Sequence, residues 1–219
     1  MHHIQQYVLA RLATLGSSRY RDIKPQDVEG NLFAYHLNHL LKENLIDHKD
    51  KLYRLTASGL RYVGQLSSTT EQPRIQPKIV TLIACQNDLG QWLLYKRTKE
   101  PFLGLEGFPY GKIHLGETIE QAAKRELKEK TGLSATLAHI GEAYVITYKN
   151  KELISHMLFH VFLAQNYSGE LVSRSASGQF FWEEIRAVSV KRFFPGFAEV
   201  FRAVSSNKYP FFLEVKKQV

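Results

Sequence analysis

Apolar residues recur at helical spacing in the first third of the chain and at strand spacing through much of the rest. Helices are expected at residues 4–15, 20–24, 31–43 and 56–66, and a β-hairpin of two short strands at 45–47 and 52–55. Pro25 ends the second helix, and Thr56 is a good N-cap for the last one. The order in residues 1–66 is therefore helix, helix, helix, hairpin, helix.

The pattern changes after a polar stretch at 67–77, which contains two prolines and no apolar period and is expected to be a linker. Strands are expected at 79–84, 91–97, 136–148, 153–165, 180–182 and 211–216, and helices at 118–130 and 195–205. Residues 98–108 are expected to form a loop. The sequence thus predicts an α+β protein of two domains, 1–66 and 78–219.

Charge and cysteine content narrow the class of protein. The formal net charge of +8 favours anionic partners, either nucleic acid or nucleotide phosphates, and does not choose between them. The single cysteine, Cys85, excludes an intrachain disulfide and fits a reducing compartment, so we expect a cytoplasmic protein. Apolar runs are too short for a membrane span, and no membrane partner is expected.

The helix expected at 118–130 gathers charged residues on one face. A buried stripe formed by Ile119, Ala122, Ala123 and Leu127 fixes its orientation. Glu126, Glu129 and Lys130 are three and four residues apart and share a surface, and Glu117 enters from the N-terminal end. Grouped carboxylates repel one another unless a cation lies between them, and Mg²⁺ or Mn²⁺ prefers such oxygen ligands.

This stretch, Gly111 to Leu133, resembles the Nudix box, G-x5-E-x7-R-E-U-x-E-E-x-G-U, where U is aliphatic. The positions that match in register are Gly111, Glu117, Arg125, Glu126, Leu127, Glu129, Gly132 and Leu133. The resemblance implies an α/β/α sandwich and a Mg²⁺ or Mn²⁺ site. It implies that Glu126 and Glu129 hold metal or activate water, and that Arg125 orients a box glutamate. Glu117 and the backbone carbonyl of Tyr110 are further candidate ligands.

Lys130 departs from the box, because the family has a second glutamate there. Two outcomes are open: a weaker metal site, or a Lys130 ammonium that pairs with Glu126 in place of one metal. Tyr110 also departs, since the family has glycine at this position. A third reading, a solvated and salt-bridged helix face, does not account for the other matching positions.

Three cations near the box are candidates for binding substrate phosphates: Lys96, Arg97 and Lys112. The alternative for each is a solvated surface charge. The substrate or effector is expected to be a nucleotide-like small molecule, as the resemblance implies.

Residues 1–66 resemble a winged helix-turn-helix domain, in which the third helix enters the DNA major groove and the hairpin contacts the backbone. Carried over to this chain, the candidate contacts to double-stranded DNA are Asn31, Tyr35, His36, Asn38, His39 and Lys42 on the helix and Lys49, Lys51 and Arg54 on the hairpin. Lys and Arg outnumber Asp and Glu by 9 − 6 = +3 here and by 20 − 15 = +5 in the rest, so the charge is not concentrated on this domain. The alternative is a domain for dimerisation or protein contact, and a homodimer is the assembly expected from dimerisation.

Three functions follow from these resemblances. The first is Mg²⁺-dependent hydrolysis of a nucleoside diphosphate linked to another moiety, coupled to DNA binding. The second is a transcriptional regulator whose weakened Nudix domain senses a nucleotide-like effector without efficient turnover. Nudix-related regulators join the two modules in the opposite order. The third is an interaction adaptor that uses neither site.

Overall fold

The computed structural model describes residues 1–67, 73–189 and 191–219, and the chain divides into two compact units, Met1–Gln76 and Pro77–Val219. The expected linker at 67–77 includes residues 68–72, which lie outside the described residues. Each unit has its own apolar core. No helix within the described ranges is long and apolar enough to cross a membrane.

The described residues of the first unit form four helices and one hairpin, in the predicted order. Its elements are α1 (His3–Leu15), α2 (Tyr20–Ile23), α3 (Gly30–Lys42), β1 (Ile46–Lys49), β2 (Leu52–Leu55) and α4 (Ala57–Val63). Apolar side chains of α1 and α3, including Val8, Leu12, Phe33 and Leu37, form a single core with Ile23 and Ile46. The two strands pair antiparallel, and Asp50 and Lys51 make the turn at positive φ.

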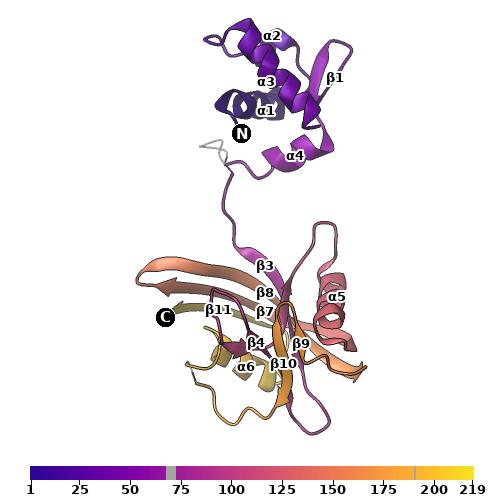
Figure 1. Ribbon diagram of the computed structural model, residues 1–219, viewed down its shortest axis with the longest axis vertical. Helices are drawn as coiled ribbons and strands as arrows, with labels where there is room; N and C mark the ends of the chain where they lie inside the picture. Colours follow the sequence, from indigo (N-terminus) through magenta and orange to yellow (C-terminus); the bar gives the residue numbers. More distant parts are fainter. Residues whose placement is uncertain (68–72, 190) are drawn as a thin grey trace. The chain divides into compact units, whose positions relative to one another are not determined.

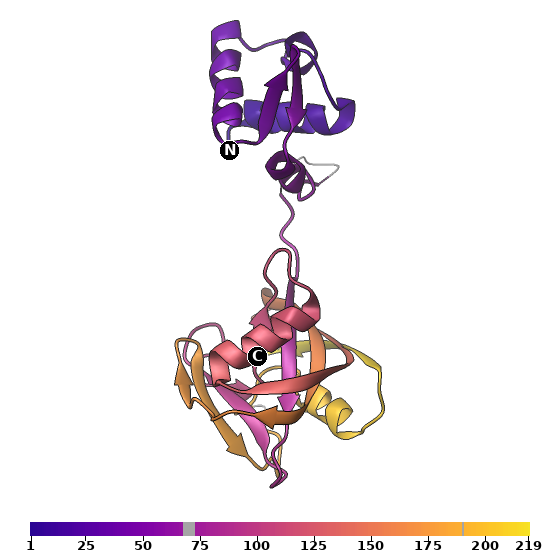
Figure 2. The ribbon, with the colours of Figure 1, turned by 90° about the vertical axis from the view of Figure 1, so that its right-hand side faces the viewer.

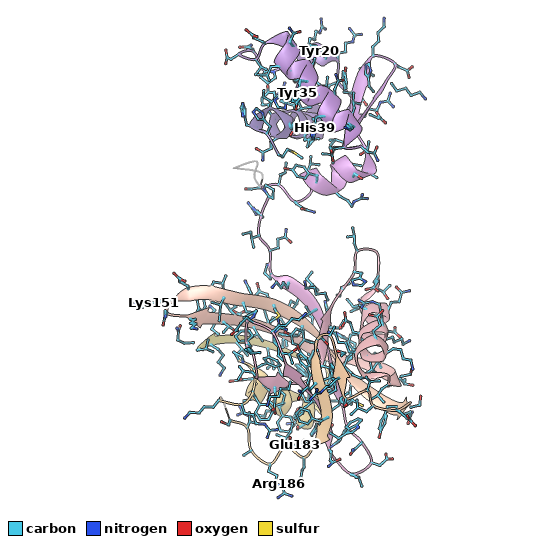
Figure 3. All side chains as sticks on the ribbon, in the orientation of Figure 1. Tyr20, Tyr35, His39, Lys151, Glu183 and Arg186 are labelled. Carbon is cyan, nitrogen blue, oxygen red and sulfur yellow. The ribbon has the colours of Figure 1, made fainter. Side chains whose placement is uncertain are left out.

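The prediction that His36 is exposed on the third helix is wrong. The residue is only 6% exposed, and its ring stacks on that of His2 with 4.1 Å between centroids. Burial, with help from nearby histidines, lowers the pKa of His36, so its imidazole is neutral at pH 7. The other α3 candidates, Asn31, Tyr35, Asn38, His39 and Lys42, are exposed, and Figure 3 shows Tyr35 and His39 projecting from the helix. Lys49 and Lys51 are exposed on the hairpin, whereas Arg54 is partly buried.

Two sheets and two helices are formed by the part of the second unit that the structure describes (Figure 1). Its elements are β3 (Lys78–Cys85), β4 (Trp92–Arg97), β5 (Glu106–Gly107), β6 (Tyr110–Lys112), α5 (Ile119–Thr131), β7 (Ser134–Lys149), β8 (Glu152–Ser168), β9 (Arg174–Ser175), β10 (Gly178–Glu183), α6 (Phe197–Ser205) and β11 (Phe211–Gln218). The long strands and both helices confirm the predicted elements. β5 and β6, short strands of two and three residues, flank the end of the stretch expected to be a loop.

The larger sheet has the strand order β11-β7-β8-β3-β6, and the smaller one has the order β5-β4-β10-β9. In the larger sheet β7 and β8 form a long antiparallel hairpin, while β3 joins β8 in parallel and β6 joins β3 antiparallel. This order places Gly111 of β6 opposite Thr81 of β3, at the edge of the sheet next to the box helix.

Helices α5 and α6 cover opposite faces of the larger sheet (Figure 2). Successive side chains of a strand alternate between faces. Val80 and Leu82 of β3 accordingly pack in the core that contains Val200 of α6, whereas Ile83 packs in the core that contains Leu127 of α5. The unit is thus a sandwich of sheet between helices, with the box helix on one face.

Candidate active site

Capping interactions define where the helix that carries the box charges begins and ends. The Thr118 hydroxyl accepts a hydrogen bond from the backbone N–H of Gln121 at 3.2 Å, and the Gln121 side chain accepts one from the N–H of Thr118 at 2.9 Å. At the other end, Gly132 adopts the left-handed conformation with φ of 75°. The helix expected at 118–130 is confirmed as Ile119–Thr131. Between these ends, Glu126 and Lys130 are adjacent on the side of the helix that meets β6.

Arg125 is the centre of the box charges. Its Nε and Nη2 donate to the two carboxylate oxygens of Glu117 at 2.6 and 2.9 Å, and Nη2 also donates to the carbonyl of Lys112 at 2.9 Å. Its Nη1 donates to Glu126 Oε1 at 2.9 Å and to Glu129 Oε2 at 3.3 Å. The expected pairing with a box glutamate is present, and one guanidinium orients three of them.

Glu117 has both carboxylate oxygens engaged. In addition to the fork with Arg125, Oε2 accepts a hydrogen bond from the backbone N–H of His114 at 2.8 Å. These hydrogen bonds, that with Arg125 first, lower the pKa of Glu117 to about 2. The carboxylate is therefore ionised at any physiological pH, and its contacts hold Arg125 and the loop before α5 in place.

Lys130 bridges two oxygen atoms at the inner end of the site, Tyr110 O and Glu126 Oε2. Its Nζ donates to the backbone carbonyl of Tyr110 at 2.5 Å and lies 2.7 Å from Glu126 Oε2. The Glu126 side chain is only 9% exposed, and Oε2 is buried without a hydrogen bond of regular geometry among the described residues. The ammonium of Lys130 therefore supplies the charge that this carboxylate oxygen needs. Of the two outcomes left open for Lys130, the structure shows pairing with Glu126.

Gly111 allows Glu126 to approach the sheet. A Cβ atom at Gly111 would lie 1.9 Å from Glu126 Cδ and Oε2, which is far inside van der Waals contact. The glycine of the box is thus required by the carboxylate packed against it, and not by a positive φ. Tyr110, where the family has glycine, keeps its carbonyl directed at Lys130 while its ring packs near Phe159 and Phe194.

A cavity of about 300 Å³ opens beside these groups. The residues that line it are Tyr95, Arg97, Lys99, Tyr110, Gly111, Lys112, His114, Glu126, Lys130 and Ser177. Four of the lining side chains are Lys or Arg and only Glu126 is acidic, so the cavity suits an anion. Its volume reaches the lower end of the roughly 300–1,000 Å³ range of small-molecule sites.

Two of the three predicted phosphate ligands, Arg97 and Lys112, line this cavity, whereas Lys96 is not among its lining residues. Because side chains alternate along β4, Arg97 lies on the cavity side and Lys96 on the other. Lys96 Nζ instead lies 3.4 Å from Glu106 Oε1. The other carboxylate oxygen of Glu106, Oε2, accepts a hydrogen bond from Arg192 at 2.6 Å.

A second, mainly apolar cavity of about 40 Å³ lies on the other side of Tyr110. Leu82, Phe102, Met157, Phe159, Phe194 and Phe197 are among its lining residues. Arg97 Nη1 donates to the Tyr110 hydroxyl at 2.9 Å, and burial raises the pKa of this hydroxyl to about 12. Tyr110 therefore stays neutral and separates the charged cavity from the apolar one.

The remaining carboxylates fit one divalent cation better than several. Glu129 is 62% exposed, and within the described ranges its one ion pair is with Arg125, 3.3 Å from Oε2, so its other oxygen is accessible. Mg²⁺ commonly binds one or two carboxylates together with water and substrate phosphate. The accessible oxygen of Glu129 suits such an ion or the water that it binds, whereas the outer oxygen of Glu126, Oε1, is held by Arg125 at 2.9 Å. The inner pair of oxygens, Tyr110 O and Glu126 Oε2, is already bridged by Lys130.

Four lining residues were not foreseen: Tyr95, Lys99, His114 and Ser177. Tyr95 was identifiable in principle, since it alternates with Arg97 on one strand. Ser177 lies 79 residues from Thr98 in the chain, and its carbonyl accepts hydrogen bonds from the Tyr95 and Thr98 hydroxyls at 2.9 and 3.3 Å. No local pattern in the sequence signals such a long-range approach.

Comparison with known proteins agrees with the geometry. The family model of the NUDIX domain matches residues 76–204, which is more than half of the chain. The chain belongs to the Nudix family. The sandwich, the box helix and its charge cluster are thus the Nudix scaffold, with Lys130 in place of one box glutamate.

Individual Nudix proteins cover the same region. An 8-oxo-dGTP diphosphatase of Haemophilus influenzae is 33% identical over 137 residues, which is 61% of this chain and 97% of that protein. An ADP-ribose pyrophosphatase of Methanocaldococcus jannaschii is 27% identical over 124 residues, or 55% of this chain and 72% of that one. A crystal structure of a MutT protein from Bacillus halodurans superposes with a TM-score of 0.55 at 22% identity, covering 64% of this chain and 90% of that chain. This last similarity shows the fold.

Gly111→Ala should destabilise the second unit by about 1–3 kcal/mol, the usual range for overpacking, because the new methyl group displaces Glu126 from Lys130 and Arg125. Urea unfolding of both proteins measures the change. Gly30→Ala is the matched control, since a Cβ at Gly30 meets no atom within 4 Å. Equal destabilisation by the two substitutions would show that the contact between Gly111 and Glu126 is not a constraint.

Proposed function

We propose that this Nudix protein is a pyrophosphohydrolase that cleaves a nucleoside diphosphate linked to another moiety, with one divalent cation, Mg²⁺ or Mn²⁺, and with Lys130 as a second, built-in cation. The observation that carries the proposal is the position of Lys130 Nζ, 2.5 Å from Tyr110 O and 2.7 Å from Glu126 Oε2. The relatives support hydrolysis as the class of reaction, since two of them are named as a diphosphatase and a pyrophosphatase.

The electrostatics favour a permanent cation at this position. Two opposite unit charges 4 Å apart attract by roughly 4 kcal/mol at an effective dielectric of 20, and Lys130 and Glu126 are closer than that. Removing one partner of a buried pair strands the other charge at a penalty of about 3–5 kcal/mol, which partial exposure of Lys130 reduces. The ammonium therefore balances the charge of the Glu126 carboxylate without an exchangeable ion.

The chain's own groups divide the work of hydrolysis. Arg97, Lys99 and Lys112 line the cavity and bind the phosphate oxygens of the substrate. Arg97 is positioned for this by its own hydrogen bonds to the carbonyls of Lys99 at 2.8 Å and Glu100 at 3.3 Å. Fixed donors of this kind stabilise the charge that develops as the diphosphate is cleaved.

Glu129 is the best candidate for the general base, because it is the most exposed box carboxylate and Arg125 fixes one of its oxygens. It accepts a proton from a water whose oxygen forms a bond to phosphorus, and the bridging P–O bond breaks toward the leaving phosphate. A bound Mg²⁺ or Mn²⁺ would supply further charge on the phosphate oxygens and lower the pKa of water. Arg125 and Glu117 are positioning residues in this scheme.

The substrate class is proposed as a nucleotide, after the names of the relatives, 8-oxo-dGTP diphosphatase and ADP-ribose pyrophosphatase. The charged cavity is large enough for a diphosphate group. The apolar cavity, at about 40 Å³, is far below the roughly 300 Å³ of a small-molecule site, so the cavity as it stands does not hold a nucleobase.

The alternative proposal is a transcriptional regulator whose Nudix domain binds a nucleotide-like effector without efficient turnover. The same Lys130 contact favours it, since an occupied inner position leaves fewer carboxylate oxygens for metal. The cationic cavity serves binding in either case. The two proposals differ in what happens to a bound nucleotide.

Hydrolysis of a panel of ADP-ribose, NADH, nucleoside triphosphates and dinucleoside polyphosphates separates these proposals. Wild type should cleave at least one compound slowly with Mg²⁺ or Mn²⁺. Lys130→Met should lower kcat at least about tenfold, because one stabilising charge of about 1.4 kcal/mol or more is lost. Lys130→Glu should recover activity only at higher metal concentration, since a metal ion must then fill the position that the Lys130 ammonium occupies in wild type.

The control is Lys151→Met, at an exposed position in the turn between β7 and β8, which should leave the rates unchanged. If no compound is cleaved by any variant while one raises the melting temperature of wild type, the regulator proposal replaces the enzyme proposal.

For the first unit we propose a winged helix-turn-helix that binds double-stranded DNA through α3 and the β1–β2 hairpin. The order of three helices, hairpin and helix supports it, as does the exposure of Tyr35, His39 and Lys42 on α3. His36 is not part of this surface, because it is buried against His2. Use of the same unit for a homodimer contact is the competing proposal.

Binding to random duplex DNA should weaken steeply with salt, since each neutralised phosphate releases counterions. Lys42→Ala and Lys49→Ala should each lower the slope of log affinity against log salt by about 1, whereas Lys151→Ala should not change it. Electrophoretic shifts at several salt concentrations give the slopes. No shift at low salt, together with dimers in sedimentation, would support the homodimer contact instead.

A further inference from the structure

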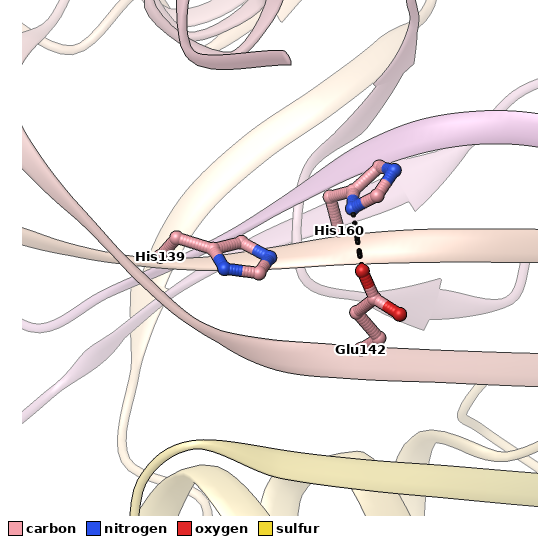
Figure 4. A group of neighbouring side chains, drawn as sticks. All are labelled: His139, Glu142 and His160. Carbon is pink, nitrogen blue, oxygen red and sulfur yellow. Dashed lines mark ion pairs between the residues drawn. The ribbon is translucent and has the colours of Figure 1, made fainter.

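Three potential metal ligands meet on the larger sheet of the second unit, on strands β7 and β8. His139 and Glu142 belong to β7 and His160 to β8, and one ligand atom from each lies within 4.8 Å of the others (Figure 4). His160 Nδ1 is 3.2 Å from Glu142 Oε1. None of the three is among the described residues that line the charged cavity beside Glu126 and Lys130.

A β-bulge brings these side chains to the same face of the sheet. Residues three apart on a regular strand point to opposite faces, so His139 and Glu142 would be separated without it. The register shifts between His139 and Gly141, so that His139 pairs with Phe162 while Glu142 pairs with His160. Since Phe162 and His160 are two apart on β8, their partners share one face.

Gly141 makes this bulge possible. It has φ of 152°, and a Cβ atom there would lie 2.4 Å from the carbonyl oxygen of Phe211 on the neighbouring strand β11. Only glycine fits this combination of backbone angle and close approach. The convergence of the three ligands is thus encoded in the strand itself and does not depend on a flexible loop.

The state of His160 suits metal binding. Its Nδ1 is buried and takes part in no hydrogen bond of regular geometry within the described ranges, although Glu142 is close enough for an ion pair. An imidazole nitrogen without a hydrogen-bond partner has a lone pair to offer to a metal, and neutral imidazole is the form that binds metals.

We propose that His139, Glu142 and His160 form a site for a divalent cation of the Zn²⁺ class, with the fourth coordination position open to water. Two imidazole nitrogens and one carboxylate oxygen suit Zn²⁺ and similar transition metals, whereas Mg²⁺ prefers oxygen ligands alone. The site therefore differs in chemistry from the carboxylates of the Nudix box.

The distances are compatible with this coordination. Tetrahedral ligands at about 2.0–2.2 Å from Zn²⁺ are roughly 3.3–3.6 Å apart. The contact between His160 and Glu142 is already close to that separation, at 3.2 Å. His139 is exposed, so its ring can move the remaining distance by rotation about its side-chain bonds without disturbing the core.

The test is calorimetric titration of Zn²⁺ into the full chain in excess Mg²⁺, which occupies the box carboxylates. Wild type should bind one more Zn²⁺ than His139→Ala, Glu142→Gln and His160→Gln, or bind it at least about 100-fold more tightly, since loss of a direct ligand should exceed the 10–100-fold effect of an outer-shell change. His156→Gln is the matched control. This residue is also on β8, four positions away and partly buried, and should leave Zn²⁺ binding unchanged.

Two further measurements distinguish loss of this site from misfolding of the variants and from Zn²⁺ binding at other residues. His139→Ala alters only an exposed side chain, so its melting temperature in EDTA should equal that of wild type while its stabilisation by Zn²⁺ is lost. Co²⁺ should give the visible absorption of a four-coordinate site in wild type and in His156→Gln but not in the cluster variants. Identical Zn²⁺ binding by wild type and all three cluster variants would overturn the proposal and assign the binding to other histidines, such as those of the first unit.

Discussion

The carboxylate of Glu126, buried between the side chains of Arg125 and Lys130, is the constraint on which the Nudix unit's site depends. Arg125 binds its outer oxygen at 2.9 Å and Lys130 contacts its inner oxygen at 2.7 Å. A buried carboxylate without partners would either take up a proton or destabilise the fold. Gly111 must lack a side chain to make room for it, and the carbonyl of Tyr110 must face the ammonium that neutralises it.

This arrangement changes how the Nudix scaffold handles charge. Nudix hydrolases generally depend on a divalent metal, usually Mg²⁺. Such an ion dissociates from the site when the metal concentration is low. A lysine is covalently attached and singly charged, so it keeps the inner oxygens neutralised at all metal concentrations but provides less charge than a divalent ion. In our proposal the inner part of the site is therefore always assembled, and a single divalent cation is needed only on its exposed side.

Local signals in the sequence are sufficient to predict the box helix and the long β7–β8 hairpin. They are insufficient where contacts between distant segments determine the position of a side chain. Thr118 and Gly132 mark the ends of α5 in the sequence as they do in the structure. Burial of His36 depends on stacking with His2, 34 positions earlier, and could not be read from the periodicity of α3.

Two other features needed the strand register. Lys96 and Arg97 are adjacent cations, and only their alternation about β4 tells which one reaches the cavity. His139 and Glu142 are three apart on a strand and would be assigned to opposite faces, because the bulge that unites them arises where Gly141 meets the carbonyl of Phe211. Lys130 was identified as the departure that matters, but its contact with Tyr110 O depends on how β6 lies against α5.

The most direct test of the central claim is a count of Mn²⁺ ions bound by wild type and by Lys130→Glu, using calorimetry together with electron paramagnetic resonance of free Mn²⁺. If the ammonium of Lys130 holds the inner cation position, Lys130→Glu binds one more Mn²⁺ than wild type, because the restored carboxylate and Tyr110 O become available to an ion. Any Mn²⁺ bound elsewhere is common to both proteins and cancels in the difference. Equal numbers of bound Mn²⁺ at equal affinity would contradict the account.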